Sequence, residues 1–107
     1  ILLNYDKLRY RLLPYTYSLA ARVTNDNYAI MRCLAIDFRN DKNVYNLTDQ
    51  YMFGPAFLIN PVTQQCDTGS NASAQTKTRK VYLPKGSKWF NFLTGEAIHG
   101  GQSIDAE

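Results

Sequence analysis

Two carboxylates are the first candidates for chemistry. Asp37 and Asp41 stand at the end of an almost continuous apolar run, where the chain enters a polar loop. A pair of carboxylates can divide general acid and general base work between them. In the structural alternative, Asp37 accepts hydrogen bonds from loop N–H groups and Asp41 begins a turn. The spacing favours the structural interpretation, and acid/base work stays the second hypothesis.

The histidine and the cysteines form no recognisable catalytic or metal-binding pattern. His99 is the single histidine and stands beside two glycines in a polar segment. A catalytic triad would need it to meet an activated Ser or Cys and an orienting carboxylate, and the sequence contains no GxSxG motif. Cys33 and Cys66 lie in no CxxC or Cys/His cluster. We therefore assign no catalytic, cofactor-binding or metal-binding residue, and we expect His99 to be a solvated turn residue.

Aromatic residues offer a different chemistry, the stacking of sugar rings. The chain has eight Tyr and one Trp. Alternation along a strand lets only one of Trp89 and Phe90 face inward, which makes Trp89 the best candidate for stacking. Aromatic residues at strand positions are more often part of the core, and this is the favoured alternative.

Composition limits the classes of protein that fit. The chain has 107 residues, of which 45% are hydrophobic and 20% charged, the profile of one globular domain at most. Twelve Lys and Arg are interspersed with nine Asp and Glu, so we expect no nucleic-acid partner. No apolar run approaches the roughly 18 residues that cross a bilayer, so we expect no membrane partner. Because the chain begins at Ile1, we expect it to be part of a longer protein.

The hydrophobic pattern predicts a long helix followed by strands. Over residues 1–23 apolar side chains recur at helical spacing, with Leu8, Leu12, Tyr15 and Leu19 as the central stripe. Pro14 should kink this helix or split it. The later elements predicted are a strand within 28–38 buried on both faces, a helical turn over 49–53, a strand from 56, an exposed polar loop near 63–78, and a hairpin or meander from strands at 80–83 and 88–92 with one more near 104.

Several segments resemble, in the same order, the motifs of glycoside hydrolase family 31, the α-glucosidase and α-xylosidase family. The similarity covers nearly the whole chain except residues 64–78. Departures from the family pattern include Cys33 and Arg39 in place of prolines, Asn60 in place of Ala and Asn91 in place of Asp. The matching segments are residues 8–20 (LRYRLLPYTYSLA), 30–34 (IMRCL), 37–41 (DFRND), 49–55 (DQYMFGP), 58–62 (LINPV), 79–86 (RKVYLPKG) and the WF, TGE and GGQ elements after it.

The resemblance implies an α+β fold. Residues 1–55 would be the C-terminal end of a catalytic (β/α)8 barrel, containing its last helix and strand. Residues 56–107 would begin the C-terminal β-sandwich domain, built of antiparallel strands. In such a barrel helix Pro14 produces a kink instead of a split. Asp37, at the end of the expected barrel strand, would then lie just behind the residues that contact the sugar.

The resemblance also implies a function for the longer protein. Family members are retaining α-glycosidases that use one Asp as nucleophile and another as acid/base. Both aspartates belong to earlier barrel strands, and no position here matches either motif, so this chain is expected to be structural and inactive alone. The motif wording favours an α-xylosidase that releases terminal α-linked xylose from oligosaccharides.

Two alternatives to the enzyme remain open. The chain could be a non-catalytic sugar-binding module that uses Trp89, or part of an inactive glycosidase homologue whose upstream aspartates are replaced. A barrel helix without its barrel would expose its wide apolar stripe, so we expect the isolated chain to self-associate.

Overall fold

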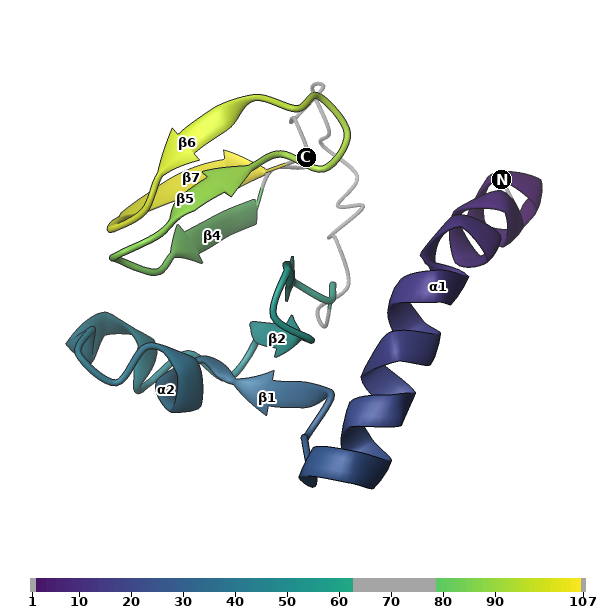
Figure 1. Cartoon of the computed structure of the whole chain (residues 1–107). Coiled ribbons are helices and arrows are strands. Elements are labelled where there is room, and N and C mark those ends of the chain that lie inside the picture. The colour runs from purple at the N-terminus through teal and green to yellow at the C-terminus, as the bar shows by residue number, and fades with distance from the viewer. Residues whose placement is uncertain (1, 63–78, 107) are drawn as a thin grey trace.

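The computed structural model describes residues 2–62 and 79–106, which form one long helix and two groups of short strands (Figure 1). The polar loop expected near 63–78 lies outside the described residues. Figure 1 shows the long helix standing beside the first group of strands, with the second group gathered at the top of the view. The elements are α1 (Leu2–Asp26), β1 (Met31–Cys33), α2 (Leu34–Asp37), the 3-10 turn η1 (Lys42–Val44), β2 (Tyr51–Phe53), β3 (Phe57–Ile59), β4 (Arg79–Leu83), β5 (Lys88–Phe90), β6 (Ala97–His99) and β7 (Gln102–Ala106).

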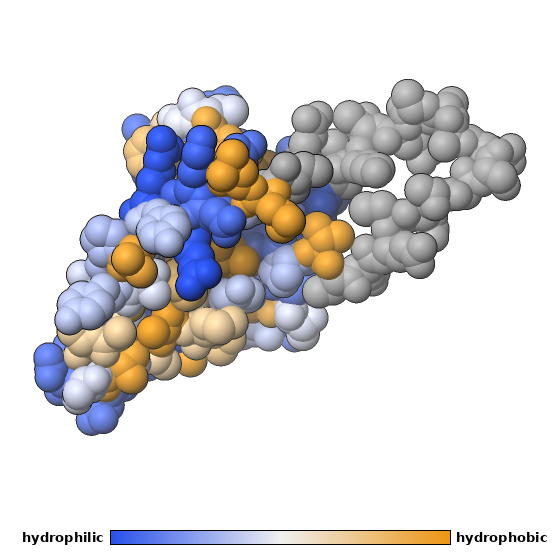
Figure 2. Space-filling view, turned by 90° about the vertical axis from the view of Figure 1, so that its right-hand side faces the viewer, coloured by the Kyte–Doolittle hydropathy of each residue, from blue (hydrophilic) through white to orange (hydrophobic). Residues whose placement is uncertain are grey.

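Helix α1 is continuous through Pro14, so it does not split. The predicted central stripe is the side that the rest of the chain covers, since Leu19 is buried and Leu8, Leu12 and Tyr15 are half-buried. The apolar residues around that stripe are exposed, and orange and blue side chains interleave over the side of the molecule where α1 lies (Figure 2). The exposed large apolar residues of α1 are Leu2, Leu3, Tyr5, Tyr10, Leu13, Tyr17 and Val23.

The strand expected within 28–38, buried on both faces, is wrong in length and burial. Strand β1 has three residues, and Met31 and Cys33 at its ends are exposed. The chain then turns into helix α2, which buries Leu34 and leaves Ile36 exposed. A short apolar run does not distinguish a buried strand from a short helix, which explains the error. Strand β1 pairs antiparallel with β2, whereas the strands of a (β/α)8 barrel run parallel.

Residues 49–53, expected to form a helical turn, contain strand β2 instead. Met52 at its centre is buried and lies between Arg32 of β1 and Leu58 of β3, which gives the antiparallel sheet order β1-β2-β3. A tight turn at Gly54 and Pro55 joins β2 to β3. The sheet therefore extends across the domain boundary predicted between residues 55 and 56, which stays a prediction.

The C-terminal strands exist where they were predicted, but their pairing differs. Strand β4 pairs antiparallel with β7, while β5 pairs antiparallel with β6, a strand that the sequence pattern missed. The strands at 80–83 and 88–92 therefore do not pair with each other. Each pair is extended by one backbone bond: Gly101 N donates to Leu83 O (2.7 Å) at the end of the β4–β7 pair, and Gly100 N donates to Ser87 O (3.1 Å) at the end of the β5–β6 pair. The result is an α+β chain whose described strands pair only in antiparallel fashion.

The core is small and lies between the two groups of strands. Its buried centre consists of Leu34, Val44 and Met52. Half-buried residues from both groups surround it, among them Phe38, Leu47, Leu58, Tyr82 and Trp89. Within residues 2–62 and 79–106, no helix has the length and apolar character needed to span a membrane.

Candidate functional site

The turn between β2 and β3 is the point where α1 meets the sheet. Gly54 is buried there, with φ of +62°, and its N–H donates to the carbonyl of Ile30 (2.7 Å). A Cβ at this position would lie 2.2 Å from Tyr15 Oη and 2.7 Å from Leu19 Cδ1. The helix therefore packs directly on the backbone of the turn, in a space that only glycine leaves open.

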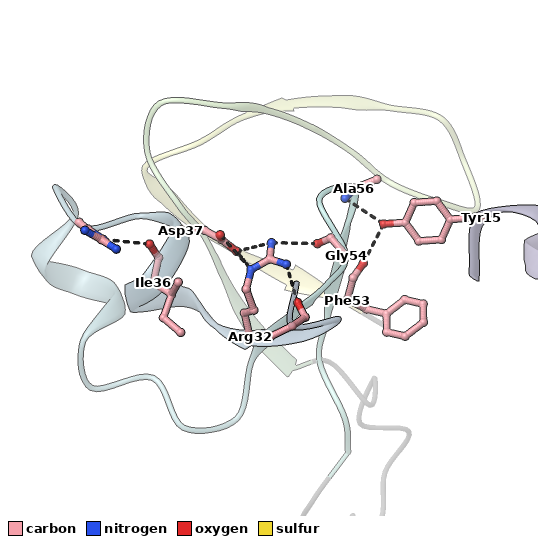
Figure 3. Close-up of polar contacts among 9 residues, drawn as sticks. Tyr15, Arg32, Ile36, Asp37, Phe53, Gly54 and Ala56 are labelled. Carbon is pink, nitrogen blue, oxygen red and sulfur yellow. Dashed lines mark hydrogen bonds and ion pairs between the residues drawn. The ribbon is translucent and has the colours of Figure 1, made fainter. Parts of the chain in front are cut away.

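Tyr15 closes this contact with its hydroxyl group. The hydroxyl donates to the carbonyl of Phe53 (2.9 Å) and accepts from the N–H of Ala56 (3.2 Å), so it bridges both sides of the turn (Figure 3). The ring packs edge-on against Phe57, with centroids 5.1 Å apart. Because one side chain satisfies two backbone groups of the turn, Tyr15 holds the turn in its conformation.

Asp37 forms a salt bridge with Arg32 (Figure 3). Arg32 Nε lies 3.1 Å from each carboxylate oxygen of Asp37, and Nη2 lies 2.9 Å from Oδ2. The other guanidinium contacts are to Ala29 O (2.8 Å), to Gly54 O (3.5 Å) and to the ring of Tyr28, whose centroid is 4.4 Å away. The hydrogen bonds that Arg32 donates to Asp37 are the main reason that the pKa of Arg32 is raised. The partner of Asp37 is thus a side chain, and the prediction that loop N–H groups bind it is wrong.

Asp41 is buried and links three parts of the chain. Its Oδ1 accepts from the N–H of Asn43 (3.2 Å), which caps η1. Its Oδ2 accepts from the Tyr82 hydroxyl (2.7 Å) and from the N–H of Lys85 (2.9 Å). The predicted turn-starting role of Asp41 is confirmed. Burial acts to raise the pKa of Asp41, but the bonds from Lys85, Tyr82 and Asn43 outweigh it, and the pKa is lowered. Burial is also the main reason that the pKa of Tyr82 is raised.

Gln50, which directly precedes β2, makes a second polar link to β4. Its side-chain amide donates to Tyr82 O (2.9 Å) and accepts from Tyr82 N (3.1 Å), so it pairs with one residue of β4 as a neighbouring strand would. The adjacent Asp49 forms an ion pair with Arg79 at the start of β4. The segment before β2 is therefore attached to β4 by the side chains of Asp49 and Gln50, of which Asp49 pairs with Arg79.

An open polar depression of about 360 Å³ lies beside Asp37 and Asp41. Asp37 and Asp41 line it together with Arg39 and Lys85. The carboxylate of Asp37 is engaged by Arg32, and both oxygens of Asp41 accept bonds within a buried network. Their arrangement supports the structural interpretation of this pair over acid/base work.

Trp89 lies against the core. Its indole N–H donates to Pro84 O (3.0 Å), and its ring packs at a tilt on Phe38, with centroids 5.8 Å apart. These contacts favour the packing alternative, and sugar stacking by Trp89 stays a prediction. His99 is an exposed residue at the end of β6. Among the residues that the structure describes, no group of His, Cys, Asp and Glu could hold a metal ion.

Sequence reasoning missed Tyr15, Gln50 and Gly54 as joining residues. Tyr15 was counted only as part of the apolar stripe, and its hydroxyl contacts are 38 and 41 residues away along the chain. Gln50 and Gly54 both belong to the DQYMFGP segment, whose resemblance to a family motif was the one signal that singled them out.

Comparison with known proteins gives the family. Residues 27–107 match the model of the "Glycosyl hydrolase family 31 C-terminal domain". An α-xylosidase of Saccharolobus solfataricus is 45% identical over all 107 residues, which is 13% of its own length. An isomaltosyltransferase of Sporosarcina globispora is 38% identical over 101 residues, 94% of this chain and 8% of that protein. Other relatives are named α-glucosidases.

Solved structures agree with this assignment. The crystal structure of a family 31 α-xylosidase from Xanthomonas citri superposes with a TM-score of 0.76 at 48% identity, covering 89% of this chain and 9% of that one. The chain thus spans between 8 and 13% of the length of these relatives. A family model that covers residues 27–107, a relative aligned over the whole chain and a matching structure lead to one conclusion: the chain belongs to glycoside hydrolase family 31.

Proposed function

We propose that this chain is a structural part of a retaining α-glycosidase, and that the complete protein is an α-xylosidase releasing terminal α-linked xylose from oligosaccharides. The observation that carries the proposal is the 45% identity to an α-xylosidase over all 107 residues, against 38% to the isomaltosyltransferase. In this proposal α1 is the last helix of the catalytic barrel, and the C-terminal β-sandwich domain begins near residue 27, where the family match starts, and not at residue 56 as the sequence predicted.

The engaged carboxylates support a structural role for the chain. Retention requires two carboxyl groups about 5 to 5.5 Å apart, one as nucleophile and one as acid/base. Asp41 is buried with both oxygens bonded, and Asp37 is held by Arg32, so neither is placed to attack a sugar. We therefore propose that the catalytic pair lies elsewhere in the complete protein and that Asp37 lies behind the residues that contact the sugar.

Activity of the complete protein tests the proposal. The coding DNA upstream of Ile1 is sequenced, the whole reading frame is expressed, and kcat/KM is measured on aryl α-xylosides and α-glucosides, with NMR of the first anomer formed. We expect a preference for the xyloside and the α-anomer as first product. A preference for the glucoside would reassign the protein as an α-glucosidase, and sugar binding without hydrolysis would favour the inactive homologue.

The isolated 107-residue chain is the matched control in the same assay. We expect it to release no sugar, because hydrolysis by this mechanism needs the missing carboxylate pair. Release of xylose or glucose by this chain alone would refute the structural role.

A further inference from the structure

The division between α1 and the strands coincides with the edge of the matched domain. Helix α1 ends at Asp26, and the C-terminal domain of the family begins its match at residue 27. The turn that α1 contacts, at Gly54, lies inside that match. Contacts between α1 and this turn are therefore contacts between the C-terminal domain and the part of the protein that precedes it.

One face of α1 makes these contacts. Tyr15 and Leu19, four residues apart, both meet the space where a Cβ of residue 54 would lie. Leu19 is 3% exposed, and it is the buried residue of α1 within the described part of the chain. One turn further along, the guanidinium of Arg22 lies 4.1 Å from the ring centroid of Tyr28, a residue inside the match. This face of α1 thus contacts the matched domain at two places along the helix, at Gly54 and at Tyr28.

We propose that Tyr15 and Gly54 form a joint that locks the C-terminal domain to the preceding, helix-bearing domain of the complete protein. The proposal rests on the proposed function only in requiring that the complete protein has such a preceding domain. The hydroxyl of Tyr15 bridges Phe53 O and Ala56 N, and the missing side chain of Gly54 lets α1 approach the turn closely enough for that bridge. Glycine at position 54 is needed for the contact as well as for the backbone conformation.

The chain contains a matched control that separates these two needs. Gly95 also has a positive φ, +74° against +62° for Gly54, and a Cβ there would meet nothing within 4 Å. Alanine at either position has a similar backbone cost, because both are in the left-handed region. Only at Gly54 would the new methyl group also push Tyr15 and Leu19 away.

Calorimetry and limited proteolysis of the complete protein test the joint. We expect one unfolding transition for the wild type and for Gly95→Ala. In Gly54→Ala we expect the C-terminal domain to unfold in a separate, earlier transition, with faster cleavage between α1 and β1. Tyr15→Phe should have a weaker effect in the same direction. The double variant should be less damaged than the sum of the two, because the hydroxyl oxygen nearest to the new methyl group is gone.

Several results would overturn the joint. They are equal behaviour of Gly54→Ala and Gly95→Ala, two separate transitions in the wild type, or full additivity in the double variant. If Gly54→Ala does not fold, Tyr15→Phe decides alone, and a single unshifted transition in it would refute the proposal. None of these measurements uses a substrate, so failure of the α-xylosidase assignment and failure of the joint are distinguishable.

Discussion

Replacing Asp41 by Asn tests the buried network between the loop after α2 and β4. Asn has nearly the shape of Asp, but it lacks the charge and offers one acceptor oxygen. If that oxygen takes the place of Oδ2, the bonds from Tyr82 and Lys85 remain as neutral bonds, and the amide group faces the N–H of Asn43. Bonds to charged groups stabilise by about 1.5 to 3 kcal/mol and neutral ones by about 0.5 to 1.5.

The expected loss follows from these bonds. Two weakened bonds at about 1 kcal/mol each, and one lost bond at about 1 kcal/mol, give a destabilisation of about 3 kcal/mol. Since 1.4 kcal/mol is a factor of ten, local opening around Lys85 should become roughly 100-fold more frequent. Hydrogen exchange in the peptide over residues 79–90 of the complete protein measures that opening. Asp105→Asn, an exposed acid on β7, is the matched control.

The pH dependence gives a second, independent check. The pKa of Asp41 in the folded chain lies below its ordinary value of 3.8, because its hydrogen bonds outweigh the effect of burial. A lowered pKa stabilises the fold above the ordinary value, and that stabilisation is lost as the pH falls through the folded value. The difference between wild type and Asp41→Asn should therefore be constant from about pH 5 to 7 and shrink below about pH 4. Equal exchange at pH 7, or a difference that does not begin to shrink as the pH falls below about 4, would refute this account.

Other predictions follow from the remaining contacts. Arg32→Lys should destabilise the complete protein by about 1 to 2 kcal/mol in thermal unfolding. A lysine has one nitrogen, so it cannot replace both hydrogen bonds to Asp37 and also keep the bond to the backbone carbonyl of Ala29. An unchanged unfolding midpoint would contradict this prediction. Trp89→Phe should cost about 1 kcal/mol through loss of the bond to Pro84 and leave sugar affinity unchanged, whereas weakened sugar binding in a titration would support stacking. The isolated chain should self-associate in sedimentation through the exposed apolar residues of α1, and a monomer at high concentration would count against this.

Periodic patterns predicted the long elements well and the short ones poorly. The stripe of Leu8, Leu12, Tyr15 and Leu19 is the covered side of α1, because a 25-residue helix repeats its period many times. The three-residue strands β1 and β2 show less than two periods of alternation, so their apolar runs did not reveal whether they were strands or helices.

Pairing partners could not be predicted from local pattern. Strand β4 pairs with β7 across more than 15 intervening residues, and the hairpin β5–β6 is nested between them. Proximity in sequence favoured a pairing of β4 with β5 instead. The role of Asp41 was predictable because turn capping is local, while the partners of Asp37 and Gln50 depend on side chains brought together by the fold.

The two hydrogen bonds between the side chain of Gln50 and the backbone of Tyr82 have a consequence for solubility. Strand β4 pairs with β7 on one side, and among the described strands none pairs with its other side. Unpaired strand edges can recruit strands of other molecules. On that side Gln50 occupies both the N–H and the C=O of Tyr82, so an added strand could not form its hydrogen bonds at this residue. We therefore expect that replacing Gln50 by Ala, which frees both backbone groups of Tyr82, increases aggregation of the isolated chain.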